Sequence, residues 1–168
     1  VRMGLKAFDL DGLHLVFDGL EKSSEMQADP SIGIILGGSA HPQYTEPQKT
    51  GILLFLDTNL GKLEANPGFG QIIKSEELKY RNLKNKKFEL KFSALEDGGY
   101  LVELNGLRGV LDKKYFDGSF SLKDPSRTYI SLANWVPNGT FNYRLLAAHD
   151  KTGKCAGNTE ISRALLGK

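Results

Sequence analysis

Alternating apolar and polar residues dominate this chain and predict many short β-strands. The clearest alternation is KFELKFSA at 87–94, where Phe and Leu residues are separated by charged or small polar residues. Because successive side chains of a strand point to opposite faces, one face of this segment is expected in a core and the other in water. The turn residues at 96–99 and the returning segment 100–104 predict a hairpin. Asn105-Gly106 predicts a second hairpin, ending in the segment 107–111.

The same reasoning extends to the rest of the chain. The segment 52–56 (ILLFL) is apolar on both faces, which predicts a strand in the middle of a sheet. Asp18-Gly19 is a turn signal expected to end the strand 13–17. The segment 61–70 looks irregular, and 75–82 fits either a helical turn or an extended connection. Further strands are predicted at 3–8, 31–36 and 119–122.

The segment 127–150 has two strand-like runs on either side of Pro137-Asn138-Gly139. The runs, 128–136 and 140–149, are rich in β-branched and aromatic residues, and the break between them predicts that they pair as a hairpin. On the first run, Ile130 and Leu132 are expected to face a core. The residues between them would then face the other way.

Length and composition bound the fold class. A chain of 168 residues with 40% hydrophobic content fits one domain with a sizeable core. Many short strands, 19 glycines and little helical periodicity predict an all-β protein, an antiparallel β-sandwich or jelly roll. We place the sandwich domain at 1–157 and a short C-terminal helical tail or linker at 158–168.

Charge and cysteine content exclude several classes of protein. The net charge is +2, from 22 basic and 20 acidic residues interspersed along the chain, and this argues against a nucleic-acid-binding face. No apolar run approaches the length of a membrane helix, so no membrane insertion is expected. A single cysteine, Cys155, excludes a disulfide within the chain. Scarce cysteine suits the cytosol, but many bacterial exported domains of this size also lack disulfides, so cysteine content leaves the compartment open. The absence of an initial Met favours one module of a longer protein.

The segments KFELKFSALEDGGYLVELNG and YISLANW…FNYRLLAA give the chain a resemblance to the concanavalin A-like lectin and glucanase superfamily, including laminin-G-like jelly rolls. The resemblance covers about two thirds of the chain as a pattern of strands and implies the fold more than the activity. Families of this kind include carbohydrate-binding modules, lectins, adhesion domains and retaining glucanases. The Glu-x-Asp-x-Glu catalytic strand of the glucanases is missing here, which argues against an enzyme.

No other catalytic pattern is present. Glycoside hydrolysis needs two opposed carboxylates, but Glu96 and Asp97 lie in a predicted turn, and Glu89 and Glu103 are expected to be solvated. The histidines are isolated from any nucleophile motif.

Calcium is the cofactor that the sequence leaves open. Asp9, Asp11, Asp57 and Asn59 supply hard oxygen ligands at strand ends, and sandwich lectins that this chain resembles often hold a structural calcium ion. The same residues are also ordinary turn formers.

The predicted binding residues are aromatic and polar side chains of the final hairpin and one loop. A Trp ring beside a turn can stack on a sugar while amides and Arg bind hydroxyl groups; a core tryptophan is the alternative. These residues are Trp135, Tyr129, Asn134, Arg144 and Tyr44.

The function predicted from the sequence is a non-catalytic carbohydrate-binding module of a larger protein, extracellular or at the cell surface. It would bind a glycan or polysaccharide and adjoin other domains of the same chain. The alternatives are a structural or protein-interaction domain of a surface protein, and a glycosidase or lyase with an unrecognised site.

Overall fold

The computed structural model describes residues 5–6, 10–38, 52–66, 68, 70–116, 129–135 and 140–149. Within these ranges almost all regular structure is β. The strands are β1 (Leu5–Lys6), β2 (His14–Lys22), β3 (Ser31–Gly38), β4 (Ile52–Asp57), β5 (Lys62–Asn66), β6 (Gly70–Lys74), β7 (Phe88–Ala94), β8 (Tyr100–Leu104), β9 (Leu107–Leu111), β10 (Tyr129–Trp135) and β11 (Phe141–His149). The helical elements are η1 (Glu76–Leu78), α2 (Tyr80–Leu83) and η2 (Lys113–Phe116). No helix in the described ranges is long and apolar enough to span a membrane.

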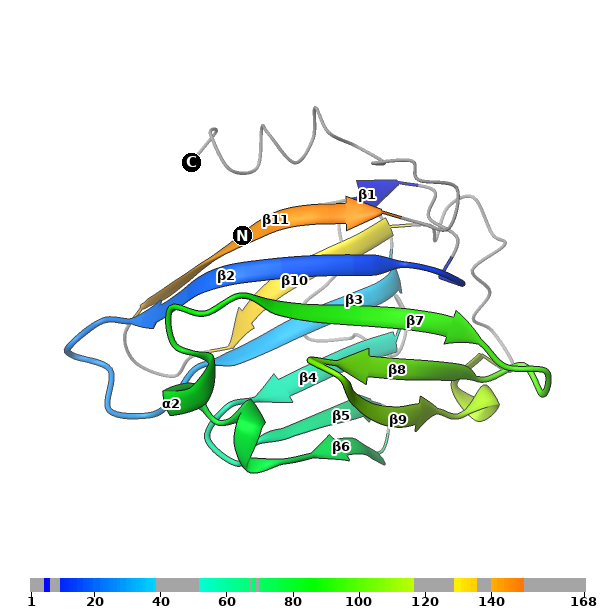
Figure 1. Cartoon of the computed structure of the whole chain (residues 1–168), viewed down its shortest axis with the longest axis horizontal. Coiled ribbons are helices and arrows are strands. Elements are labelled where there is room, and N and C mark those ends of the chain that lie inside the picture. Colours follow the sequence, from blue (N-terminus) through cyan, green and yellow to red (C-terminus); the bar gives the residue numbers. More distant parts are fainter. Residues whose placement is uncertain are drawn as a thin grey trace.

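The strands form two antiparallel sheets that face each other (Figure 1). The six-stranded sheet has the order β1-β10-β3-β4-β5-β6, and the five-stranded sheet has the order β11-β2-β7-β8-β9. Strands β3 to β6 and strands β7 to β9 are each consecutive neighbours. The all-β class expected from the sequence is therefore confirmed.

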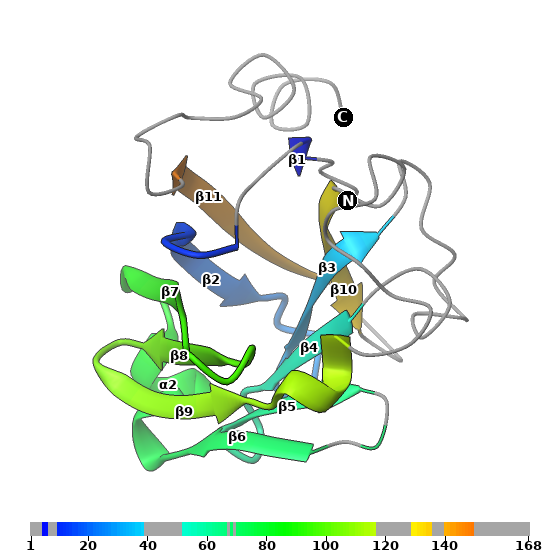
Figure 2. The ribbon, with the colours of Figure 1, turned by 90° about the vertical axis from the view of Figure 1, so that its right-hand side faces the viewer.

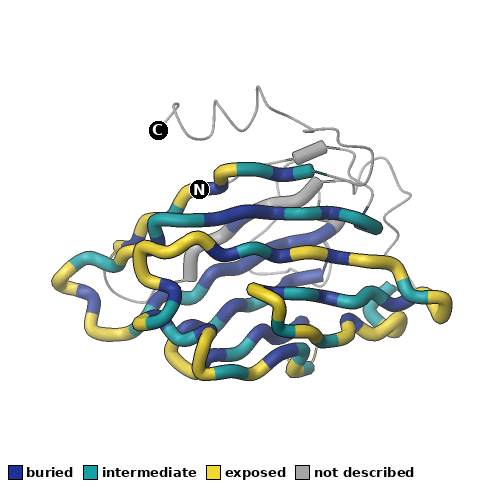
Figure 3. The backbone as a smooth tube through the Cα atoms, in the orientation of Figure 1, coloured by how far each residue is buried: buried dark blue, intermediate teal, exposed yellow. Residues whose placement is uncertain are grey.

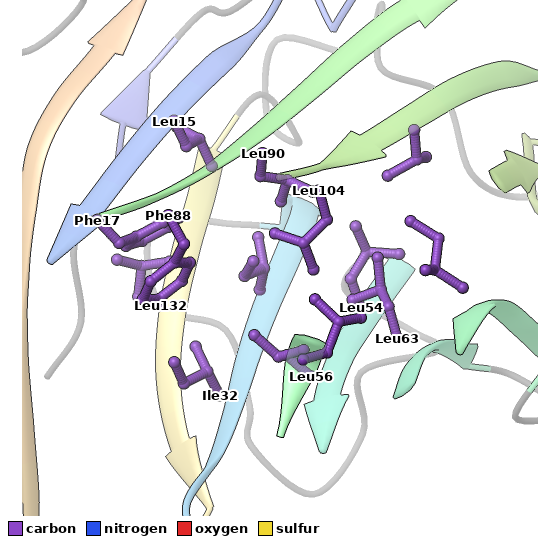
Figure 4. Packing of buried hydrophobic residues seen from close by; sticks show 14 of the residues in the cluster. Leu15, Phe17, Ile32, Leu54, Leu56, Leu63, Phe88, Leu90, Leu104 and Leu132 are labelled. Carbon is purple, nitrogen blue, oxygen red and sulfur yellow. The ribbon is translucent and has the colours of Figure 1, made fainter. Parts of the chain in front are cut away.

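One hydrophobic core fills the space between the two sheets (Figure 4). The five-stranded sheet contributes residues such as Phe17 and Phe88, whose rings stack with centroids 5.2 Å apart. The six-stranded sheet contributes Leu54 and Leu63, which are fully buried. Removal of this apolar surface from water is the main stabilising term of the fold.

The two sheets approach each other closely at one edge, where β6 lies beside β9 (Figure 2). A Cβ atom on Gly109 of β9 would come within 2.1 Å of the carbonyl oxygen of Ile72 on β6. Only glycine fits this approach, so Gly109 allows the two edge strands to close this side of the molecule.

The predicted hairpins around residues 96–99 and 105–106 are confirmed. β7 pairs with β8 and β8 pairs with β9, with Leu104 opposite Leu107. Asn105 and Gly106 both have positive φ, 50° and 79°, as a type I′ turn requires. The segment 52–56 is confirmed as a central strand, since β4 lies between β3 and β5.

The strand predicted at 13–17 continues through its expected turn to Lys22. Gly19 has a φ of +68°, and the register with β11 shifts between Asp18 and Glu21. A glycine with positive φ can form a bulge as well as a turn. The prediction of a turn at this position was wrong for that reason.

The prediction of an irregular segment at 61–70 was also wrong. Residues 62–66, half of this segment, form β5, which pairs with β4 on one side and β6 on the other. Its sequence, KLEAN, has two apolar residues among polar ones, which is too short an alternation to predict a strand. Pairing on both sides, rather than local propensity, makes it a strand.

The most important correction concerns the final hairpin. β10 pairs with β1 and β3 in the six-stranded sheet, whereas β11 pairs with β2 in the five-stranded sheet. The two runs are strands, as predicted, but they do not pair with each other. β10 and β11 belong to different sheets and are not neighbouring strands.

Several predictions fall outside the described residues. These are the loop containing Tyr44, the strand at 119–122, Cys155 and the helical tail at 158–168.

Candidate functional site

The candidate site lies on the outer face of the six-stranded sheet, the face that points away from the core. Alternation along β4 and β5 assigns residues to this face, because their neighbours in sequence belong to the core cluster. Two rows of residues that are Cα partners on neighbouring strands run across this face. Each row is named after its residue on β4. The Phe55 row contains Gly33, Phe55, Glu64 and Gln71. The Asp57 row contains Ser31, Asp57, Lys62 and Lys74.

Glu64 is the most unusual residue of this face. It is only 8% exposed, and it is the one charged residue that is buried among those whose burial the structure describes. Lys62 forms a salt bridge with the Oε1 atom of Glu64. Burial of a carboxylate is costly unless it is paired, so this side chain is held in place by a specific partner.

Lys62 lies between two carboxylates. Its hydrogen bond to Glu64 raises the pKa of the Lys62 ammonium above its ordinary value, and the nearby charges of Glu64 and Asp57 act in the same direction. These attractions outweigh the opposing effect of partial burial. Lys62 is therefore a firmly charged donor at neutral pH.

Asp57 is fixed by the turn that joins β4 to β5. Its Oδ1 atom accepts the backbone N–H groups of Asn59 at 2.9 Å and Leu60 at 3.0 Å. Gly61 closes the turn by donating its N–H to the carbonyl oxygen of Asp57 at 2.9 Å. These two backbone hydrogen bonds fix the orientation of the Asp57 carboxylate, which lies beside Lys62.

Phe55 is the aromatic member of the site. It is half-buried and lies opposite Glu64 on β5 and Gly33 on β3. The neighbouring apolar pair on this face, Ile35 and Leu53, is buried. The accessible part of the face is therefore the part around Phe55 and the Asp57 row.

The backbone of β10 brings one predicted binding segment to the same sheet. Trp135 is the Cα partner of Ser31, and Asn134 is the partner of Ile32. Ser31 is in turn the partner of Asp57, so the Asp57 row continues into Trp135. Tyr129 lies at the other end of β10, opposite Gly38 and Lys6.

Arg144 does not join these residues, because β11 belongs to the five-stranded sheet. Its guanidinium donates from Nε and Nη2 to the two carboxylate oxygens of Asp18, each at 2.9 Å. The Nε and Nη2 donors of Arg144, which were expected to bind sugar hydroxyl groups, are therefore already bound to Asp18. The role predicted for Arg144 depended on the hairpin, and the structure does not support that grouping.

The predicted calcium ligands that the structure describes are also separated. Asp11 precedes β2 and accepts the N–H of Ala94 at 2.8 Å, whereas Asp57 ends β4 and caps its turn. Figure 1 shows the start of β2 and the end of β4 at opposite ends of the sheets. Asn59 is exposed in the turn after β4, and Asp9 is outside the described residues. Within those residues, no group of three or more His, Cys, Asp or Glu side chains could hold a metal ion. Calcium stays a prediction.

The outer face of the five-stranded sheet is different in character. Ion pairs between exposed or half-exposed side chains run across it, including Arg108 with Glu103 at 3.0 Å and Lys91 with Glu89 at 3.8 Å. His14 lies 3.4 Å from the same carboxylate of Glu89. This is a solvated face, as the sequence predicted for Glu89 and Glu103.

No family model matches the chain, and no curated protein matches it in sequence.

The sequence did not single out Phe55, Lys62 or Glu64 as neighbours on one face. Phe55 stands inside a continuous apolar run, where nothing distinguishes it from core residues. Lys62 and Glu64 were placed in an irregular segment, so their common face could not be recognised. The one available signal was Lys-x-Glu, a spacing that puts both side chains on one face if the segment is a strand.

Proposed function

We propose that this protein is a non-catalytic carbohydrate-binding module of a larger extracellular or cell-surface protein, and that the outer face of the six-stranded sheet binds the glycan. The observation that carries the proposal is the grouping of an accessible aromatic ring, Phe55, with the buried Glu64 and its partner Lys62. A sugar presents an apolar ring face and a rim of hydroxyl groups. An aromatic ring stacks on the former, and charged or amide groups bind the latter.

The polar groups of this face are suited to hydroxyl groups. The carboxylates of Glu64 and Asp57 accept hydrogen bonds and Lys62 donates them, and each is held by its neighbours before any ligand arrives. A site that is already ordered pays less conformational entropy on binding. Trp135, whose backbone continues the Asp57 row, is proposed as a second stacking residue.

We also propose that the two sheets form the sandwich of jelly-roll type implied by the resemblance to concanavalin A-like proteins. The path of the chain supports this arrangement. It passes between the sheets after β1, β2, β6, β9 and β10, so each sheet is assembled from segments far apart in sequence. Such crossings distinguish jelly rolls from simple meanders.

Affinity electrophoresis through gels containing soluble neutral polysaccharides tests the function. Retardation of the wild-type protein by at least one polymer is expected, with a dissociation constant in the millimolar to micromolar range, roughly −4 to −8 kcal/mol. Phe55→Leu keeps most of the apolar surface but removes the ring, and should weaken binding about tenfold. Leu101→Ala, at a half-buried position on β8 in the other sheet, is the matched control and should bind normally.

The results also separate the alternatives. If Leu101→Ala reduced the retardation and Phe55→Leu did not, the glycan would bind to the five-stranded sheet and not to the six-stranded sheet. If a broad set of polysaccharides leaves the wild-type protein unretarded, the proposal is wrong and a structural or protein-interaction domain becomes the better interpretation.

A further inference from the structure

A second feature stands apart from the sheet faces: the turn between α2 and β7, at one end of the molecule (Figure 1). It has the sequence KNKK, and its three lysines, Lys84, Lys86 and Lys87, are all exposed (Figure 3). We call this set the lysine turn. It brings three positive charges within four residues.

The backbone of the lysine turn is fixed. The N–H of Lys84 donates to the carbonyl oxygen of Tyr80 at 2.7 Å, and that of Asn85 donates to Leu20 on β2 at 3.1 Å. The N–H of Lys86 donates to Leu83 at 3.1 Å. Buried residues, Leu83 and Phe88, hold the turn at both ends, so its charges are presented from a rigid support.

The lysine turn also differs in its charge balance from most of the described surface. Most other basic side chains in the described ranges are ion-paired, for example Lys22 with Asp29 at 2.8 Å and Lys79 with Glu76 at 2.9 Å. The three lysines of the turn make no ion pair or hydrogen bond through their side chains with any described residue. Glu21, the residue after Leu20, is not paired with them either. Because no described carboxylate pairs with these three ammonium groups, the lysine turn carries a positive potential that is not neutralised locally.

The geometry points to the lysine turn as a binding site for an anionic polysaccharide that bears sulfate or phosphate groups. Closely spaced ammonium groups on a rigid turn complement a linear polymer whose charges recur at short intervals, and binding releases the counterions of the polymer. This site is separate from the outer face of the six-stranded sheet and does not depend on the function proposed for that face.

Polysaccharide fits the lysine turn better than nucleic acid does. Surfaces that bind single-stranded nucleic acid combine a basic groove with aromatic side chains that stack on bases, and duplex-binding proteins place a helix or β-ribbon in a groove. The aromatic residues adjoining this turn, Tyr80 and Phe88, are buried. The turn can therefore recognise charge but has no described group for reading bases.

Binding of heparin, a phosphorylated mannan and duplex DNA, measured at several salt concentrations, tests this inference. The triple variant Lys84→Gln, Lys86→Gln, Lys87→Gln should bind the two polysaccharides roughly tenfold or more weakly, with a shallower dependence on salt. Comparison of heparin with the phosphorylated mannan distinguishes sulfate from phosphate as the preferred group.

The matched control removes the same charge elsewhere, by changing Lys91, Lys113 and Lys114 to Gln. It should bind almost as wild type, and thermal unfolding should show both triple variants to be folded. Equal losses in the two variants would mean that net charge alone is responsible and would overturn the site. Tighter binding of DNA than of either other polymer would overturn the ligand class, and no binding of any polymer would overturn the inference.

Discussion

The pair of Glu64 and Lys62 shows how a single residue can mark a site. A carboxylate that is 8% exposed on the side of a sheet facing away from the core contributes less to folding than an apolar residue of similar size would. Its pairing with Lys62 offsets part of the desolvation cost. A charged group retained at such a position is a reason to look for a binding role.

The pH dependence of stability tests this pair. The pKa of Lys62 is raised above its ordinary value of 10.5 in the folded protein, so the pair stabilises the fold below that pH and its contribution is lost as pH rises through the raised pKa. Urea unfolding between pH 8 and strongly alkaline pH, compared for wild type and Glu64→Gln, measures this. The wild-type protein should lose more of its free energy of unfolding, whereas parallel curves would contradict the pairing.

Trp135 gives the second test at the scale of the residue. Trp135→Ala should abolish glycan binding while leaving the fold intact, as the sequence predicted and as the register of β10 with β3 allows. A tryptophan in the core would behave differently, because its truncation costs about 3–5 kcal/mol. Thermal unfolding and sugar affinity, measured on the same variant, distinguish the two; a collapsed melting temperature would show that Trp135 is structural.

At the scale of the element, strands with regular alternation could be predicted from the sequence and their partners could not. The segment 87–94 became β7 with its expected buried face, and the Asn105-Gly106 turn formed as its φ angles require. β10 and β11 were correct as strands but wrong as a hairpin. Local sequence determines extension and turning, whereas the choice of sheet depends on contacts such as β10 with β3 that are remote in sequence.

Engineered disulfides can test the pairing of β11. Glu21 and Asn142 are exposed Cα partners on β2 and β11, at the separation of neighbouring antiparallel strands, about 4.5–5.5 Å, which suits a disulfide. In a background with Cys155→Ser, the pair Glu21→Cys and Asn142→Cys should form a disulfide on oxidation, seen as a mobility shift without reductant.

The matched pair for this experiment keeps Asn142→Cys and combines it with Asn134→Cys. A β10–β11 hairpin around residues 137–139 would place these two positions opposite each other, whereas the structure assigns them to different sheets. This pair should remain reduced. If the pair Asn134→Cys and Asn142→Cys formed a disulfide rapidly, and the pair with Glu21→Cys formed none, the β10–β11 hairpin would be correct after all.

At the scale of the whole molecule, the two outer faces differ in the side chains that they present. The five-stranded sheet presents ion pairs that are open to water, one between β8 and β9 (Arg108 with Glu103) and one within β7 (Lys91 with Glu89), and such pairs are worth little individually. The six-stranded sheet presents a half-buried ring beside a buried charge. The sequence could predict the polar face of the five-stranded sheet from the alternation of 87–94, but not the outer face of the other sheet, because 52–56 is apolar on both faces. It could not predict which polar residues share a face, because that required the register of β4, β5 and β10.

Backbone amide NMR during titration with an oligosaccharide, taken from a polymer that retards the protein, locates the glycan-binding surface. Chemical-shift changes are expected on the outer face of the six-stranded sheet, at Phe55, Lys62 and Glu64, together with the indole N–H of Trp135. Shift changes confined to β7, β8 and β9 of the other sheet would contradict this location.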